Sequence, residues 1–72
     1  MIGIIVAMKA EAAEIKAAMT DKQTRTQSGI EFVSGRFCGK DVVVAQSGVG
    51  KVFAAVCAQT MILTYHPTYI IN

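Results

Sequence analysis

Glu11 is the side chain whose position in the sequence best suits chemistry. It follows the apolar run Ile2–Ala7 and opens a segment with helical periodicity. Ligands of α/β folds bind beyond the carboxyl ends of the strands, and the positive end of a helix stabilises a carboxylate in its first turn. A solvated carboxylate that only balances the helix dipole would occupy the same position, so the residues alone leave both interpretations open. Glu14, one turn further on, is expected on the surface.

Residues 47–51, Ser-Gly-Val-Gly-Lys, lie between an apolar run and a helical segment, where phosphate-binding loops are found. A P-loop would need glycine at Ala45 and a hydroxyl residue at Val52. The dinucleotide-binding fingerprint would need a third glycine at Phe53. These departures favour a tight strand-to-helix turn, although the backbone N–H groups of such a turn could still meet a polar ligand group.

The remaining nucleophilic and metal-binding residue types are few. One histidine, His66, and two distant cysteines, Cys38 and Cys57, give no zinc-binding spacing. No serine or cysteine has a histidine partner suited to nucleophilic catalysis, and Cys57 is expected to be inert packing on a helix. We therefore expect no metal and no cofactor.

The N-terminal half must position Glu11. The β-branched run Ile2–Ala7 predicts a strand buried on both faces, as in a parallel sheet. The region from Lys9 to about Lys22 predicts a helix, and Asp21–Gly29 a polar loop. The buried stripe expected for this helix has members at helical spacing: Met8, Ala12, Ile15 and Met19.

The C-terminal half predicts a hairpin of strands 30–37 and 41–46, joined at Gly39, then a helix over 51–65 and a second buried strand over 68–71. His66-Pro67 ends the helix, because the residue before proline disfavours helical geometry. The apolar face expected for this helix comprises Phe53, Val56, Cys57, Thr60, Met61 and Thr64. The order strand, helix, two strands, helix, strand predicts an α/β fold.

The composition resembles the interior of a larger protein. The 72 residues are 53% hydrophobic and 17% charged, with a mean hydropathy of +0.45, although a small free-standing domain needs extra stabilisation of its thin core. We therefore expect a piece of a bigger fold, or a subunit buried against others. A net charge of +2 argues against nucleic-acid and membrane partners. Two unpaired cysteines fit a reducing, cytoplasmic location.

Three motifs in register resemble the methylthioadenosine/S-adenosylhomocysteine nucleosidases. Residues 2–11 are similar to the family's opening strand, its Ala-Met pair and its acidic patch. Residues 47–52 are similar to its Ser-Gly-Ile/Val-Gly-Lys turn, and residues 67–72 to the strand before its Thr-Gly-Ser/Thr-Ala-Gly-Gly loop. The resemblance spans all 72 residues. It implies the nucleoside-phosphorylase fold, three-layered around a central mixed sheet, of which residues 1–72 are the incomplete N-terminal portion of one domain.

The resemblance also implies an activity and a site. The expected reaction is hydrolysis of the N-ribosidic bond of 5′-methylthioadenosine or S-adenosylhomocysteine to release adenine, by a homodimer. The family's water-activating glutamate falls on Glu11, its methionine beside the ribose on Met8, and its pocket-lining Ile/Val on Val49. General-base chemistry suits Glu11, since water must be oriented against an oxocarbenium-like carbon.

Departures from the family limit what the chain can do. Members often carry acidic residues where Lys9 and Ala10 stand here. The family's ribose-binding glutamate and purine-protonating aspartate come later than Asn72, so residues 1–72 alone are expected to be inactive. The phosphorylase relatives hold phosphate with an arginine near the first helix, and Lys9 in its place favours water as the nucleophile. Two alternatives remain: a related hydrolase or phosphorylase, such as one acting on futalosine, and a non-catalytic interaction fragment.

Overall fold

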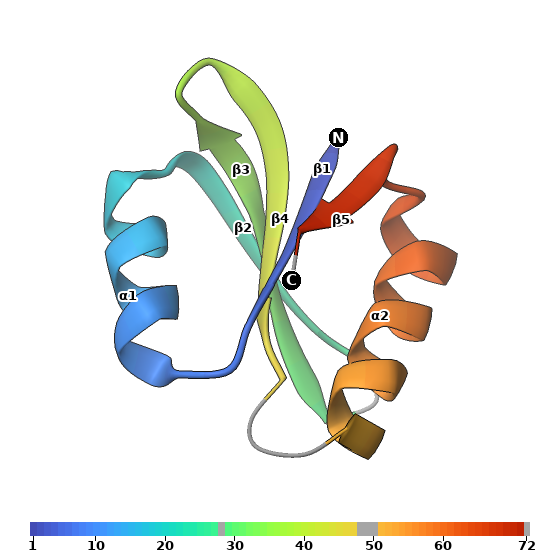
Figure 1. Ribbon diagram of the computed structural model, residues 1–72. Helices are drawn as coiled ribbons and strands as arrows, with labels where there is room; N and C mark the ends of the chain where they lie inside the picture. The colour runs from blue at the N-terminus through green and yellow to red at the C-terminus, as the bar shows by residue number, and fades with distance from the viewer. Residues whose placement is uncertain (28, 48–50, 72) are drawn as a thin grey trace.

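The computed structural model describes residues 1–27, 29–47 and 51–71, with the backbone alone for residues 51–54. Five strands form one mixed sheet in the order β2-β3-β4-β1-β5, with a helix on each face (Figure 1). The fold is α/β, as predicted. The elements in chain order are β1 (Ile2–Val6), α1 (Lys9–Ala18), β2 (Thr20–Gln27), β3 (Ile30–Phe37), β4 (Lys40–Gln46), α2 (Lys51–Tyr65) and β5 (Tyr69–Ile71).

Strand β1 lies inside the sheet and is parallel to both neighbours. Ile2 pairs with Val42 of β4 on one side and with Tyr69 of β5 on the other. Its side chains alternate between the two helix-covered faces, so Ile5 packs on the α2 side and Ile4 on the α1 side. A strand covered on both faces needs apolar residues throughout, which confirms the interpretation of the opening run.

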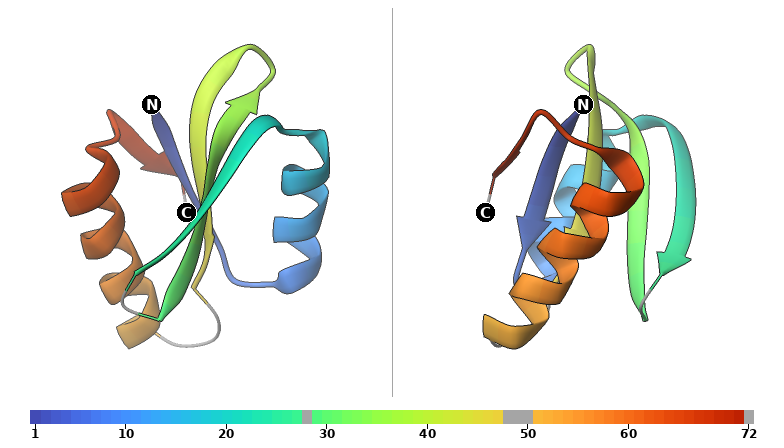
Figure 2. Two further views of the ribbon diagram at one scale, coloured as in Figure 1. Left: turned by 180° about the vertical axis from the view of Figure 1, so that it is seen from behind. Right: turned by 90° about the vertical axis from the view of Figure 1, so that its right-hand side faces the viewer.

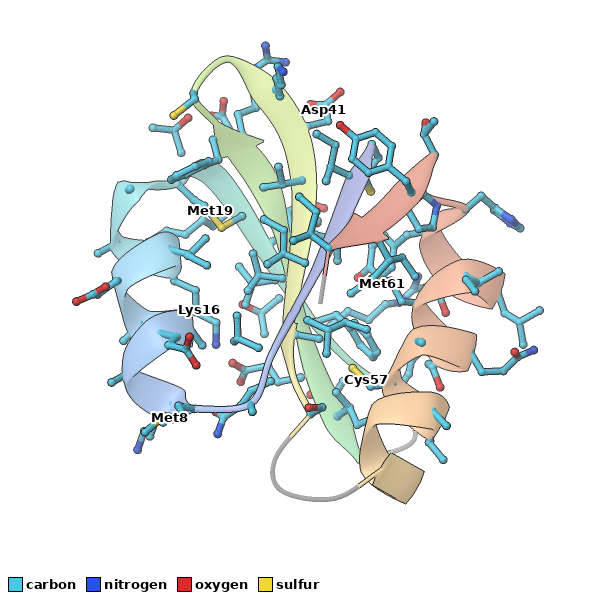
Figure 3. The ribbon with its side chains drawn as sticks, viewed as in Figure 1. Met8, Lys16, Met19, Asp41, Cys57 and Met61 are labelled. Carbon is cyan, nitrogen blue, oxygen red and sulfur yellow. The ribbon has the colours of Figure 1, made fainter. Side chains whose placement is uncertain are left out.

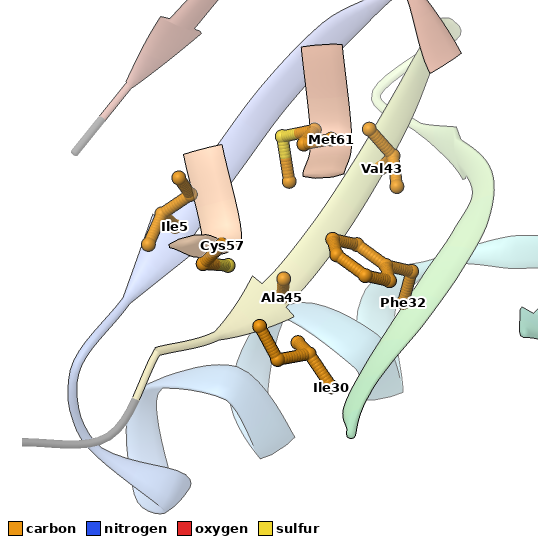
Figure 4. Packing of buried hydrophobic residues seen from close by; sticks show 7 residues of the cluster. All are labelled: Ile5, Ile30, Phe32, Val43, Ala45, Cys57 and Met61. Carbon is orange, nitrogen blue, oxygen red and sulfur yellow. The ribbon is translucent and has the colours of Figure 1, made fainter. Parts of the chain in front are cut away.

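The hydrophobic core has two halves, one on each face of the sheet. Between α2 and the sheet, a cluster of buried side chains forms around Phe32 (Figure 4). The centroid of the Phe32 ring lies 5.9 Å from that of the Tyr65 ring. The members of this cluster are Ile5, Ile30, Phe32, Val43, Ala45, Cys57 and Met61. Between α1 and the sheet, a second cluster comprises Met19, Val33, Val42 and Val44. The result is three layers, helix–sheet–helix, seen edge-on in the left view of Figure 2.

Helix α1 is shorter than predicted. It ends at Ala18, and Met19 already has extended backbone (φ −82°, ψ 151°). Ala12 and Met19 are buried and Ile15 is half-buried, as the expected stripe requires. The prediction that Met8 belongs to the buried stripe was wrong, because Met8 is the N-cap residue, outside the helix, and its side chain is 62% exposed.

The predicted loop over Asp21–Gly29 was wrong, because residues 20–27 form strand β2. It pairs antiparallel with β3, with an irregularity between Thr20 and Gln23. Almost every residue of β2 is polar and exposed, so it has no apolar alternation that would identify a strand. Pairing with β3, rather than burial, holds it in place.

The hairpin of β3 and β4 confirms the prediction for residues 30–46. Cys38 and Gly39 connect the strands, and both have positive φ (52° and 77°). Two consecutive positive φ values define the type I′ turn, whose twist matches that of the flanking strands. Arg36 stabilises the turn by donating hydrogen bonds to the Asp41 carboxylate (3.2 Å) and the Gly39 carbonyl oxygen (2.8 Å).

Helix α2 ends at Tyr65, before His66-Pro67, as predicted. His66 has a positive φ of 50° and donates its backbone N–H to the Ile62 carbonyl oxygen (3.1 Å). Cys57 and Met61 are fully buried, but Val56, expected on the same face, is exposed. The Phe53 side chain is outside the described residues.

The second predicted buried strand, over residues 68–71, is only partly confirmed. Strand β5 forms over Tyr69–Ile71, but Tyr69 and Ile71 are about half exposed. In the described chain β5 has β1 on one side only, and α1 does not extend over it.

Candidate functional site

The carboxyl ends of β1 and β4 meet at one edge of the sheet. Val6 pairs with Gln46, and the backbone N–H of Ser47 donates a hydrogen bond to the Val6 carbonyl oxygen (2.9 Å). Helices α1 and α2 both begin at this edge, shown at the bottom of Figure 1. Ser47, the first residue of the second motif, is therefore a neighbour in space of the end of the first strand, although the two lie far apart along the chain. This edge is the place where parallel α/β sheets bind ligands.

Met8 and Glu11 stand at the first turn of α1 on this edge. The Met8 carbonyl oxygen accepts the first helical hydrogen bond, from Ala12 N–H (3.2 Å), and Met8 provides no side-chain cap. Ala12 is 1% exposed, so this turn is held firmly against the sheet. The Met8 side chain points away from the core, at the lower end of α1 in Figure 3.

The Glu11 carboxylate is exposed in the first turn. Among residues 1–27, 29–47 and 51–71 it has no hydrogen-bonding or ion-pairing partner. Lys16, one and a half turns later, instead forms an ion pair with Glu31 of β3 (3.3 Å). A carboxylate at a helix N-terminus whose oxygens are not occupied by a protein partner is able to accept a hydrogen bond from water and take up its proton. Lys9 and Ala10, which replace acidic residues of the resembled family, are also exposed.

Val49, the third predicted site residue, lies outside the described residues. The described part of its motif is Ser47, which is buried (8% exposed) and tied to the end of β1. Sequence reasoning did not single out Ser47 as a residue that joins the two motifs. Its place as the first residue after a buried strand was the available signal.

A polar hollow of about 380 Å³ lies elsewhere, on the α2 face of the sheet. Its lining comes from β2, β3 and the last residue of α2: Gln23, Thr24, Arg25, Ser34 and Tyr65. Strand β2 is separated from β1 by two strands, so the hollow contains none of the predicted site residues. We assign the candidate site to the carboxyl edge because Met8, Glu11 and Ser47, the first residue after β4, lie there.

Two further features bear on the possible chemistry. Within the described ranges, no three His, Cys, Asp or Glu side chains are grouped as a metal site would require. Burial raises the pKa of the Cys57 thiol, which keeps it protonated and unreactive.

In the described part of the chain, neither helix has the length and hydrophobicity that a membrane span requires.

Comparison with known proteins matches the entire chain to one family. The phosphorylase superfamily matches residues 1–72. The 5′-methylthioadenosine/S-adenosylhomocysteine nucleosidase of Shewanella loihica is 54% identical over 71 residues, which are 99% of this chain and 31% of that protein. The chain thus spans about a third of the length of this relative.

Solved structures agree with the sequence comparison. A nucleosidase of the same name from Colwellia psychrerythraea, in complex with adenine, superposes with a TM-score of 0.96 at 39% identity, covering 99% of this chain and 29% of that one. The futalosine hydrolase of Helicobacter pylori superposes with a TM-score of 0.85 at 30% identity, covering 96% of this chain and 30% of that one.

Proposed function

Because the chain belongs to the phosphorylase superfamily, we propose that its protein is a nucleosidase that releases adenine from 5′-methylthioadenosine and S-adenosylhomocysteine. The observation that carries this proposal is the 54% identity over 71 residues with a nucleosidase of that name. Residues 1–72 are then the N-terminal portion of one nucleosidase domain. The proposed activity belongs to the protein at its natural length.

In this proposal Glu11 orients and deprotonates the attacking water. Water adds its hydroxyl group to the anomeric carbon of the ribose, the bond to the adenine nitrogen breaks, and a proton completes the leaving adenine. The exposed Glu11 carboxylate, without a partner in the described chain, is available to accept the proton from water. General-base assistance of this kind contributes about 10²–10⁴-fold to a rate.

Met8 and Val49 are proposed to line the sugar and 5′-thio end of the substrate. A thioether next to an apolar 5′-substituent gives favourable contact without a hydrogen-bonding requirement. The support for Met8 is its 62% exposure at the carboxyl edge, directly before α1. The support for Val49 is its place in the turn that follows Ser47. Protonation of adenine is assigned to residues outside this chain.

The test is adenine release by the natural-length protein in phosphate-free buffer. Turnover of methylthioadenosine without phosphate is the expected result. A strict phosphate requirement would instead identify a phosphorylase. Inertness towards methylthioadenosine with turnover of futalosine would identify the second candidate, which the similarity to the futalosine hydrolase of Helicobacter pylori supports.

The proposed partners are a small nucleoside substrate and a second copy of the same chain. A homodimer is part of the proposal because the resembled nucleosidases form homodimers. We also propose a cytoplasmic location, which two free cysteines suit.

A further inference from the structure

Arg25 is a cation on the α2 side of the sheet that has no anionic partner. It stands on β2 opposite Phe32 of β3, and directly paired residues of antiparallel strands point to the same face of a sheet. Phe32 belongs to the core cluster beneath α2, so Arg25 lies on that side as well. Among residues 1–27, 29–47 and 51–71, its guanidinium group makes no hydrogen bond and no ion pair.

The carboxylates of the sheet do not neutralise this guanidinium group. Glu31 is paired with Lys16 of α1 (3.3 Å) and therefore lies on the opposite face. Asp41 is paired with Arg36 next to the turn of the hairpin (3.2 Å). Asp21, at the start of β2, forms no ion pair within the described ranges. A cation that is not balanced by its own protein attracts an anion from elsewhere.

Arg25 lines the polar hollow of about 380 Å³ described above. This volume falls within the range of ligand pockets, roughly 300–1,000 Å³. The hollow is also lined by Gln23 and Ser34, which pair with each other across β2 and β3, and by Tyr65. A side-chain amide and two hydroxyl groups, all able to donate hydrogen bonds, thus surround one positive charge. This set of groups suits an anion that has oxygen acceptors.

Two contacts hold the walls of the hollow in place. The Thr64 hydroxyl donates a hydrogen bond to the side-chain oxygen of Gln27, which joins the end of α2 to β2. The Tyr65 ring lies 5.9 Å from the fully buried Phe32 ring, at an interplanar angle of 46°. The hollow is therefore formed before any ligand arrives, which reduces the entropy that binding must overcome.

We propose that this hollow binds a carboxylate, with Arg25 as its counter-ion. The planar guanidinium group presents two parallel N–H donors that match the two oxygens of a carboxylate. One carboxylate balances the single positive charge, whereas a phosphate group carries about 1.5–2 negative charges at pH 7 and would remain partly unbalanced. The Tyr65 ring offers an apolar surface to the carbon skeleton of a small organic acid.

The same chemistry has two sources, a free organic acid and a carboxylate of the natural-length polypeptide, which the experiment below distinguishes. The hollow contains none of the residues assigned to the nucleosidase site, so this inference does not depend on the proposed function. Adenine release decides that function separately.

Benzoate is the probe in an NMR titration of the natural-length protein, and benzamide is its uncharged counterpart. Benzoate is expected to shift the backbone amide signal of Ser34 in a saturable way. Arg25→Gln should weaken this binding about 10-fold or more, the effect of losing charge-assisted hydrogen bonds. The matched control is Lys22→Gln, because Lys22 donates to the Lys16 carbonyl oxygen on the α1 side. This variant loses the same charge from β2 and should bind benzoate normally.

Urea unfolding of the same variants distinguishes the two sources. If benzoate does not bind, an unfolding midpoint that falls in Arg25→Gln but not in Lys22→Gln identifies a carboxylate of the polypeptide itself, since exposed residues without a partner have little effect on stability. Benzoate binding that survives Arg25→Gln, or benzamide bound as tightly as benzoate, overturns the proposal. Absence of binding together with equal midpoints in the two variants also overturns it.

Discussion

The backbone N–H of Ser47 donates a hydrogen bond to the carbonyl oxygen of Val6 at 2.9 Å. This contact joins Ser47, the first residue after β4, to the end of β1, just before Met8 caps α1 and Glu11 stands in its first turn. A carboxylate on one turn can act on a ligand held by another only when the two are fixed relative to each other. The Ser47–Val6 contact fixes Ser47 relative to the end of β1 through the backbone, independently of any side chain.

Glu11→Gln is expected to lower adenine release by the natural-length protein by about 100-fold or more, because glutamine cannot take a proton from water. The shape of the side chain is retained and Glu11 is exposed, so the urea unfolding midpoint should not change. Steady-state adenine release measures the first effect. Glu14→Gln, on the same helix and also exposed, is the matched control and should keep normal turnover. Near-normal turnover by Glu11→Gln would remove Glu11 from the mechanism.

Gly35→Ala is expected to lower the free energy of unfolding by about 1–3 kcal/mol, as overpacking does. A methyl group at this position would lie 2.7 Å from the backbone carbonyl oxygen of Thr20, and backbone cannot rotate away as a side chain can. Urea denaturation measures the loss. Ser34→Ala, one residue earlier, adds no atom and removes only a hydroxyl that makes a long hydrogen bond to the Gln23 carbonyl oxygen (3.5 Å), so it should change the value by no more than about 0.5 kcal/mol. Equal losses in both variants would contradict the steric explanation.

Cys38→Asn is expected to raise the free energy of unfolding by about 0.5–1 kcal/mol. Cys38 has a φ of 52°, a left-handed conformation that costs most residues about 1–2 kcal/mol and that asparagine tolerates. The change creates Asn-Gly, the preferred pair of a type I′ turn. Cys38→Ser removes the thiol without this preference and should leave stability nearly unchanged. A Cys38→Asn protein no more stable than Cys38→Ser would show that backbone strain here is negligible.

The two cysteines should differ in reactivity. Cys38 is exposed and Cys57 is buried, and burial raises the pKa of the Cys57 thiol. Maleimide is therefore expected to label Cys38 in the native protein and Cys57 only after denaturation, as peptide mass spectrometry will report. Rapid native labelling of Cys57 would contradict its burial.

The raised pKa of Cys57 also predicts a pH effect on stability. Its thiol ionises more readily in the unfolded chain than in the folded one. The contribution of the neutral Cys57 thiol to the free energy of unfolding is complete below the ordinary thiol pKa, about 8.5. This contribution is lost as the pH rises through the higher pKa that the thiol has in the folded protein. The difference in unfolding free energy between the protein and Cys57→Ala should accordingly shrink above that pH. A difference independent of pH would contradict the shift.

Much of the fold follows from local patterns in the sequence. The run Ile2–Val6 is apolar because both faces of β1 are covered, and that is visible without coordinates. The hairpin follows from Gly39 between two strand-like runs, and the end of α2 from His66-Pro67. In each case the residues that identify the strand, turn or helix end in the sequence are also the residues that form it.

The other features of the fold and of the candidate site depend on contacts between residues distant in the sequence, which a local pattern does not include. Strand β2 is polar along its whole length, so only its pairing with β3 reveals it. Met8 has helical spacing but precedes the helix, and its exposure depends on where α1 begins. For the site, the type and order of residues suggested Glu11, but only the parallel pairing of β1 with β4 brings Ser47, where the second motif begins, to the same edge.

The position of β1 has a consequence for protein synthesis. Among the described strands, β1 is translated before the two strands with which it pairs, β4 and β5. The meander of β2, β3 and β4 joins neighbours in sequence, and such local contacts form early. The nascent chain must therefore keep an apolar N-terminal segment unpaired until β4 has emerged, an interval in which it is exposed to aggregation. Of the described strands, β1 is thus translated earlier than both strands that hold it in the sheet.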